Sequence, residues 1–247
     1  MQRSDVAATA SIHHETMPEV FVTRIGPRAL MRYHRAFAES PFAAALVAEA
    51  TPDPAAGNHA SGVGPCEIAG FLLGAIDPPR HYRYMLRHHG LAMAFLVSSY
   101  AATHPSLALE LLRTRARRYA SGLARMLARS VSQRLRRMAS SPPTSSATAG
   151  KAGSVFGSAD GPVHGDAQTA ELVDVAVLSR YRSHGYGARL VEAFEAAARR
   201  GGASFAELVT PPGESGAGKF YDRLGWQQVR ELTSRSAESF VLYRRVL

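Results

Sequence analysis

The sequence is poor in cysteine, in lysine and in long apolar runs, and these shortages exclude whole classes of protein. Its 247 residues include a single cysteine, Cys66, so no disulfide can form within the chain, and we expect the reducing cytoplasm as its compartment. The longest apolar stretch, residues 91–102, is interrupted by two serines and is too short to span a bilayer. Residues 1–18 are polar and lack the apolar core of a signal peptide. We therefore predict neither a disulfide-stabilised secreted protein nor a membrane-spanning one.

Patterns that hold metals or dinucleotides are missing as well. The pairs His13-His14 and His88-His89 have neither the spacing nor the helical context of a metal site, so we expect no metal. The glycine-bearing turn near residue 185 lacks the partners that a dinucleotide-binding G-x-G-x-x-G turn needs. The sequence therefore gives no support for a metalloenzyme or for a nicotinamide-dependent enzyme.

Positive charge is abundant but unevenly placed. The chain has 27 arginines, two lysines and a formal net charge of +9. Between residues 80 and 137, twelve arginines oppose a single acid, Glu110, which gives this segment a charge of +11 and leaves −2 for the rest. An acidic partner should therefore meet this segment. The preference for arginine over lysine, with many alanines, is typical of a GC-rich, bacterial-like genome.

The same basic segment has a helical pattern. From Leu112 to Met138, apolar residues recur at three- and four-residue steps, and most arginines fall off that line, which predicts an amphipathic helix with an arginine face. We therefore expect a basic helical insertion over residues 78–138. Residues 139–168 are rich in Ser, Thr, Gly, Ala and Pro, which predicts a disordered linker that is dispensable for folding.

The N-terminal part of the chain has weaker patterns. We expect residues 1–18 to be flexible, residues 19–25 to form a strand because apolar and polar residues alternate, and residues 27–39 to form a helix that begins at a proline. Residues 42–50 fit a helix or a strand. We favour a strand, because a second strand-like run follows at 67–76.

The C-terminal third has clear alternating elements. The pattern predicts strands at 171–177 and 204–210, and a helix at 185–200 that Gly201 and Gly202 terminate. A short helix at 215–224 and two strands, at 226–232 and 239–246, complete the chain. The turn before the long helix contains Gly185 and Gly187. Such a turn offers free backbone N–H groups and the positive end of the helix dipole to a phosphate, although glycines before a helix also occur in ordinary tight turns.

Two motifs together resemble the GNAT superfamily of acetyl-CoA-dependent N-acetyltransferases. The first is the strand AELVDVAV at 170–177, followed by Arg182-x-x-Gly185-x-Gly187 and a helix, which is similar to the family's acetyl-CoA signature. The second is Ala217-x-x-Phe220-Tyr221-x-x-Leu224-Gly225-Trp226, which is similar to the family's closing helix and strand. The resemblance covers residues 170–247 and extends more weakly to residues 20–76. It does not cover residues 78–165.

The resemblance implies a fold and a domain plan. It implies a mixed α/β (α+β) domain over residues 19–247, with a mostly antiparallel sheet flanked by helices and with its cofactor-binding half at 169–247. The basic insertion would lie between the third and fourth strands. The strands at 171–177 and 204–210 would splay apart at the cofactor.

The resemblance also implies roles for individual residues. Acetyl-CoA would bind backbone groups of the strand and of the turn, at Val175, Ala176, Val177, Arg182, Ser183, His184, Gly185, Tyr186, Gly187 and Ala188. Tyr221 would protonate the departing thiolate, and Glu171 stands where some members carry the carboxylate that deprotonates the amine. The family often has an asparagine soon after its fifth strand, whereas this chain has PPGE at 211–214.

Each of these positions has a structural alternative. Tyr221 would also suit a packed core, and Glu171 would also suit a solvated strand edge. Asp174 should face away from Glu171 on a regular strand, as an alternative base or a surface residue. His184 fits a solvent-facing turn position better than a catalytic one.

Two functions follow from these patterns. The first is an N-acetyltransferase that acts on a primary amine of a small molecule, and the arginines favour an anionic acceptor such as an amino sugar linked to a nucleotide. The second is an adaptor with this fold that binds an anionic membrane surface, or nucleic acid as a less favoured partner, through its arginines. Peripheral contact with an anionic membrane surface is compatible with either function.

Overall fold

The computed structural model describes residues 1–50, 67–104, 168–213, 216–233 and 238–247. The chain divides into two compact units, residues 1–97 with 153–247 and residues 98–152, and the fold below is that of the first unit. Most of the basic insertion and, apart from residue 168, the predicted linker lie outside the described residues.

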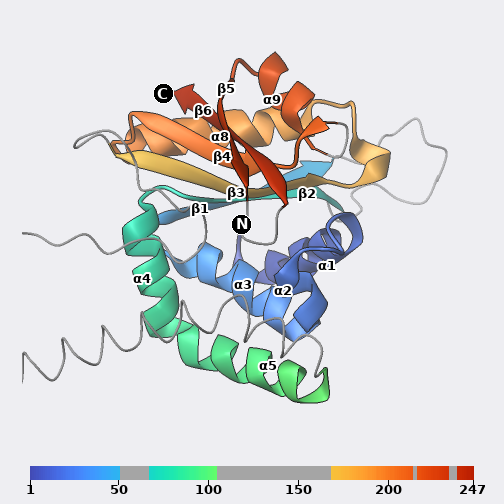
Figure 1. The fold of residues 1–247 in the computed structure, drawn as a ribbon. Helices are drawn as coiled ribbons and strands as arrows, with labels where there is room; N and C mark the ends of the chain where they lie inside the picture. Colours follow the sequence, from blue (N-terminus) through green and yellow to red (C-terminus); the bar gives the residue numbers. More distant parts are fainter. Residues whose placement is uncertain (51–66, 105–167, 214–215, 234–237) are drawn as a thin grey trace, which may run out of the picture. The chain divides into compact units, whose positions relative to one another are not determined.

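One mixed sheet forms the centre of the unit (Figure 1). The strands follow the spatial order β1-β2-β3-β4-β6-β5, and only the β3–β4 pair is parallel. Their bounds are β1 (Ala43–Ala50), β2 (Glu67–Ala75), β3 (Thr169–Val177), β4 (Phe205–Thr210), β5 (Gln227–Thr233) and β6 (Ser239–Val246). The predicted fold class, a mostly antiparallel sheet flanked by helices, is therefore confirmed.

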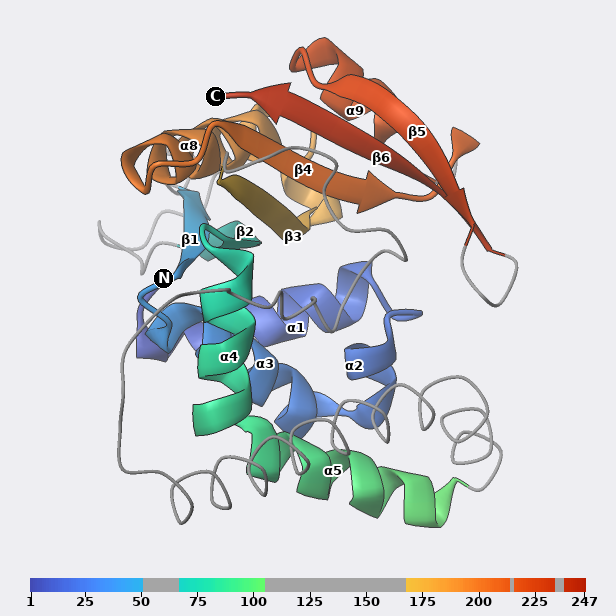
Figure 2. The same ribbon diagram turned by 60° about the vertical axis from the view of Figure 1, so that its left-hand side comes forward.

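Helices from the N-terminal part cover one face of this sheet, as Figures 1 and 2 both show. They are the 3-10 turn η1 (Arg3–Asp5) and the helices α1 (Val6–Thr16), α2 (Phe21–Ile25), α3 (Pro27–Glu39) and α4 (Pro78–His88). Helix α5 (Gly90–Thr103) follows α4. Phe37 of α3 and Ile12 of α1 pack against Phe71 and Leu73 of β2, and this cluster forms the core on that face.

Two expectations for the N-terminal part are wrong. Residues 1–18 are not a flexible lead-in, because they contain η1 and α1. The buried face of α1 includes Thr9 and His13, which are polar by type, so the hydrophobic pattern was weak. Residues 19–25 are not a strand: α2 puts Val22 and Ile25, three residues apart, on one face against Ala29 and Leu30. The basic segment consequently follows the second strand of the described chain, not the third.

Among the described residues, two helices cover the other face of the sheet, α8 (Tyr186–Arg200) and α9 (Gly218–Arg223). Val191 and Phe194 of α8 are fully buried in the core on that face. A Cβ atom at Gly74 of β2 would overlap the Phe194 ring, so this glycine lets α8 approach the sheet closely. The indole Nε1 of Trp226 donates to Glu195 at 2.9 Å, which ties α8 to the chain entering β5.

Strands β3 and β4 diverge after a short paired stretch. They pair only from Thr169↔Phe205 to Glu171↔Glu207, although β3 continues to Val177 and β4 to Thr210. The predicted splay between these strands is therefore present, and it exposes one edge of β3 at its C-terminal end. In the described part of the chain, no helix is both long and apolar enough to cross a membrane.

Candidate acyl-transfer site

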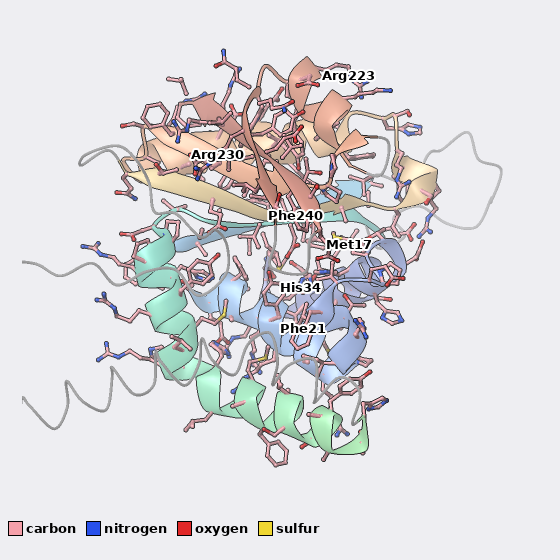
Figure 3. The ribbon with its side chains drawn as sticks, viewed as in Figure 1. Met17, Phe21, His34, Arg223, Arg230 and Phe240 are labelled. Carbon is pink, nitrogen blue, oxygen red and sulfur yellow. The ribbon has the colours of Figure 1, made fainter. Side chains whose placement is uncertain are left out.

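A cleft of about 570 Å³ opens where β3 and β4 diverge. Its walls come from the end of α1, the end of β3, the start of α8, and α9. Figure 3 labels Met17, at the end of α1, and Arg223, on α9, on opposite sides of the sheet; both line the cleft. Chain segments more than 150 residues apart in the sequence therefore build one cavity.

The turn that enters α8 has an unusual backbone. Ser183 has a φ of 66° and Gly185, the residue before the helix, has a φ of 78°. The first intrahelical bond runs from the N–H of Arg189 to the carbonyl of Gly185, so the N–H groups of Tyr186, Gly187 and Ala188 precede the helical ladder. These residues line the cleft, and their N–H groups, with the positive end of the helix dipole, fit a pyrophosphate group.

Side chains around this turn hold it in shape. The Arg182 Nε donates to the carbonyl of Val177 at 3.2 Å, and the Arg189 Nη2 donates to the carbonyl of His184 at 3.3 Å. His184 Nδ1 lies 2.7 Å from the carbonyl oxygen of Arg182, and the residue is exposed. His184 does not line the cleft, so the solvent-facing alternative describes it better than a contact with the cofactor.

The C-terminal end of β3 has a free edge along the cleft. Val175, Ala176 and Val177 pair with β2 on one side, and β4 has already diverged on the other side. All three residues line the cleft. Their outward backbone groups are therefore placed to bond the amide groups of an extended ligand, as the added strand of a sheet does.

Tyr221 lies on α9 and lines the same cleft. Its ring is buried at 4% exposure and packs against Phe220, Trp226 and Tyr243. Among the described residues its hydroxyl has no hydrogen-bond partner. Burial, and then the negative charge of Asp174, raise the pKa of Tyr221 above its ordinary value. The hydroxyl is thus protonated at neutral pH, as a proton donor must be.

Glu171 lies in the paired part of β3 and does not line the cleft. The Tyr82 hydroxyl of α4 donates to its Oε2 at 2.8 Å. Burial raises the pKa of Glu171 to about 7, while the bond from Tyr82 opposes the rise. A carboxyl with this pKa is half ionised at neutral pH, which suits a group that accepts and releases protons.

Asp174 faces the same side of the sheet as Glu171, which corrects the expectation of opposite faces. Leu73 of β2 pairs with Asp174, whereas the next residue, Gly74, pairs with Leu172, so Val173 is an extra residue on β3. This bulge shifts the alternation of side chains. The Tyr33 hydroxyl of α3 donates to Asp174 Oδ2 at 2.8 Å, on the face that α4 also covers.

A buried histidine pair lies behind Asp174. His13 Nδ1 and His34 Nε2 are 3.0 Å apart, and both side chains are fully buried; Figure 3 labels His34 within the helical layer. Burial lowers the pKa of both, for His34 to about 3, so both are neutral at pH 7. Burial raises the pKa of Asp174, although His13, in its protonated form, and the bond from Tyr33 act in the opposite direction.

The structure thus brings together most residues that the sequence singled out. The cleft is lined by Tyr221 and by the predicted cofactor positions other than His184. Glu171 lies in the part of β3 that pairs with β4, and Asp174 lies between that part and the cleft residues of the same strand. Sequence reasoning missed Met17, Tyr33 and Tyr82, which come from elements without a recognisable motif. The sequence contains one weak indication of the two tyrosines: each is an aromatic residue on the inner face of an amphipathic helix. No group of three potential metal ligands occurs among the described residues.

Comparisons with known proteins agree with this site. Residues 130–226 match the model of the acetyltransferase (GNAT) family. No curated protein matches the chain.

Solved structures give low-identity likenesses. Ard1 from Thermoplasma volcanium is 22% identical over 32% of this chain and 55% of its own, with a TM-score of 0.30, so this chain spans about half of its length. An aminoglycoside 6'-N-acetyltransferase complexed with coenzyme A is 12% identical over 98% of this chain and 89% of its own, with a TM-score of 0.47. An aminoglycoside 6'-acetyltransferase type Ii is 13% identical over 100% of this chain and 94% of its own, with a TM-score of 0.49. Residues 130–226 of this chain are therefore similar to the acetyltransferase (GNAT) family, and the site geometry above agrees with that similarity.

Proposed function

We propose that this protein transfers the acetyl group of acetyl-CoA directly to a primary amine of a small molecule. The observation that carries the proposal is the continuous cleft from the α8 turn to Tyr221. One end of the cleft has free backbone N–H groups at a helix start, and the same cleft reaches a protonated phenol. An anion-binding end and an acid in one cavity suit a phosphorylated thioester substrate.

The chain's own residues divide the work of binding. Acetyl-CoA, when bound, supplies an activated acetyl thioester. The N–H groups of Tyr186, Gly187 and Ala188 would hold its pyrophosphate, and the free edge of β3 at Val175–Val177 would bond its pantetheine amides. Gly187 keeps this space open, because a Cβ atom there would contact Phe220 at 3.4 Å and narrow the cleft.

Two residues then handle protons during transfer. The carboxylate of Glu171 would accept a proton from the acceptor ammonium, directly or through water, since an amine with a pKa near 10 cannot attack while protonated. The amine nitrogen forms the new bond to the acetyl carbon and then loses its second proton to solvent. The carbon–sulfur bond breaks, and the Tyr221 hydroxyl gives its proton to the sulfur and regains one from solvent. The free hydroxyl and high pKa of Tyr221 support this role.

The described charges support a cationic acceptor over the anionic one that the arginine-rich segment favoured. Glu171 and Asp174 face the same side of the sheet, and Glu207 adds negative charge beside Glu171. Arg80, Arg83 and Arg87 of α4 are exposed. The described arginines of the insertion thus point to solvent, whereas its Tyr82 contacts the site.

A panel experiment tests this function. Mass spectrometry of reactions with acetyl-CoA should find a mass gain of one acetyl group on amines, strongest on those with a second positive charge, and release of free thiol at the same rate. Glu171→Gln is the companion variant. It keeps the shape of the side chain but removes the base, so it should acetylate the same amines much more slowly. If no amine in a broad panel is acetylated while CoA still binds, the adaptor alternative replaces the enzyme.

A further inference from the structure

A second pocket, lined by arginines, lies on the helical layer and shares no residue with the cofactor cleft. Its volume is about 370 Å³, and its walls come from η1, the start of α1 and one face of α3. The lining residues are Arg3, Val6, Ala7, Arg28, Met31, Arg32 and Arg35. Guanidinium groups therefore dominate the polar part of this surface.

The spacing of the arginines explains how they meet. Arg28, Arg32 and Arg35 follow one another on α3 at four- and three-residue steps, so they lie on one face of the helix. The opposite face of α3 is buried against the rest of the domain, for example through Leu30. Arg3 approaches from η1 across the groove.

Carboxylates neutralise only part of this charge. Glu39 accepts an ion pair from Arg3 at 2.8 Å and one from Arg35 at 3.0 Å, both on its Oε1 atom. Its other oxygen lies 3.5 Å from His89 Nε2. In the described part of the chain, Arg28 and Arg32 form no ion pair with a carboxylate. Among the described residues, two of the four guanidinium groups thus pair with one carboxylate and the other two pair with none.

Arg32 has a further feature that an exposed solubilising arginine lacks. Its Nε atom is buried and has no hydrogen-bond acceptor among the described residues. A buried donor on a charged group normally has a partner, and a bound anion is one way to supply it. The charge of Arg32 also reaches inward: after burial, it is the next largest cause that lowers the pKa of His89.

We propose that this pocket binds a phosphate-bearing anion through Arg28 and Arg32, with Arg3 and Arg35 at its edge. Guanidinium groups suit phosphate because their N–H groups match two phosphate oxygens at once. Val6 and Met31 add apolar walls beside these groups. The phosphate belongs either to a free oligophosphate or to a lipid headgroup, and the experiment separates these sources.

The experiment measures binding to the full chain with two probes at fixed ionic strength. Calorimetry with inorganic tripolyphosphate tests the free ligand, and co-sedimentation with phosphatidylcholine vesicles, with and without phosphatidic acid, tests the headgroup. We expect at least one probe to bind wild type, and Arg28→Gln/Arg32→Gln to weaken that binding about tenfold or more, since each lost charged hydrogen bond is worth roughly a factor of ten.

A charge-matched control makes the test specific. Arg200→Gln/Arg230→Gln removes two positive charges from exposed positions elsewhere, and it should change binding less than about twofold if local contacts decide. Equal weakening by both double variants would overturn the proposal, as would the absence of binding for both probes. Binding that survives Arg28→Gln/Arg32→Gln but is lost in Gly185→Val would place the anion at the α8 turn and would also overturn it.

Discussion

The C-terminal end of β3 and the part of the strand before it present different chemical groups. At the C-terminal end, Val175–Val177 and the turn into α8 present backbone N–H and carbonyl groups to the cleft. Nearer the start of the strand, Glu171 and Asp174 present carboxylates, and each accepts a hydrogen bond from a tyrosine of a different helix. Backbone groups do not titrate, whereas these carboxyls have raised pKa values. Under the proposed function, one strand therefore separates a pH-insensitive binding region from a pH-sensitive catalytic region.

Glu171→Gln should give the largest effect and should fall on the catalytic region alone. We expect turnover to fall by roughly 10²–10⁴-fold, the usual contribution of a general base, with unchanged affinity for CoA. In wild type, kcat/KM should rise with pH through about 7, because Glu171 must ionise to act. Steady-state kinetics over pH 5.5–9, with calorimetry for CoA, measure both quantities. If Glu171→Gln keeps the rise of kcat/KM near pH 7, another group is the base.

The same variant should also gain stability. The pKa of Glu171 is raised from 4.5 to about 7 on folding, so ionisation works against the folded state, and wild type loses stability as pH rises from 4.5 to 7. Glu171→Gln does not ionise. Its free energy of unfolding should therefore exceed that of wild type at pH 8 by up to about 3 kcal/mol, and the difference should disappear by pH 4.5. Urea unfolding at the two pH values measures it.

Tyr221→Phe comes next, because Tyr221 stands where the two regions meet. The variant keeps the packed ring and removes only the proton donor, so turnover should fall about 10²-fold, with CoA affinity unchanged. Tyr243→Phe is the matched control: its ring lies 6.0 Å from that of Tyr221, and its hydroxyl bonds Asp222 instead of facing the cleft. Equal turnover in wild type and Tyr221→Phe, where chemistry limits the rate, would leave Tyr221 as a packing residue.

Gly185→Val should weaken CoA binding without changing the pH dependence of kcat/KM. Gly185 has a φ of 78°, which a β-branched residue tolerates poorly, so the turn should shift and the affinity for CoA should fall roughly 5- to 100-fold. Gly213→Val imposes the same strain, at a φ of 66° with open space around the added atom, but it lies outside the cleft. Calorimetry should find normal CoA affinity there. A similar loss of CoA affinity in Gly185→Val and Gly213→Val would mean that backbone strain disturbs the whole domain and not the turn alone.

Tyr82→Phe should produce the smallest effect, a shift in pH dependence. The hydrogen bond from Tyr82 lowers the pKa of Glu171, so its removal should move the rising limb of kcat/KM to higher pH, by roughly one unit or less. Tyr84→Phe, on the same helix but in contact with His88 and His89, should leave the limb in place. A lower turnover with an unmoved limb would assign Tyr82 a packing role only.

The motif region was predictable because its chemistry is local. The turn at Gly185, the α8 helix and the short α9 helix with Tyr221 depend on residues close together in the sequence, and the structure has them at the predicted places. The splay of β3 and β4 followed from the family resemblance. The bulge at Val173 could not be predicted, because it depends on the pairing of β3 with β2.

The predictions for residues 1–25 were wrong for a related reason. His13 and Thr9 are buried in α1, but they count as polar in any hydrophobic pattern, so residues 1–18 appeared to have no core-facing side. Residues 19–25 are too short for alternation to separate a strand from one helical turn, and burial of Val22 among neighbouring helices decides for the helix. Tertiary contacts, absent from the sequence pattern, determined both segments.

The extra residue in β3 decides which side of the sheet the two acids share. Glu171 and Asp174 are three positions apart, so plain alternation of the same residues would send them to opposite sides of the sheet, although both acids would still be present. Deleting Val173 would remove the bulge but leave the acids two positions apart, and plain alternation would then keep them on one side. The shared side therefore depends on how β3 pairs with β2, not on which side chain stands at position 173.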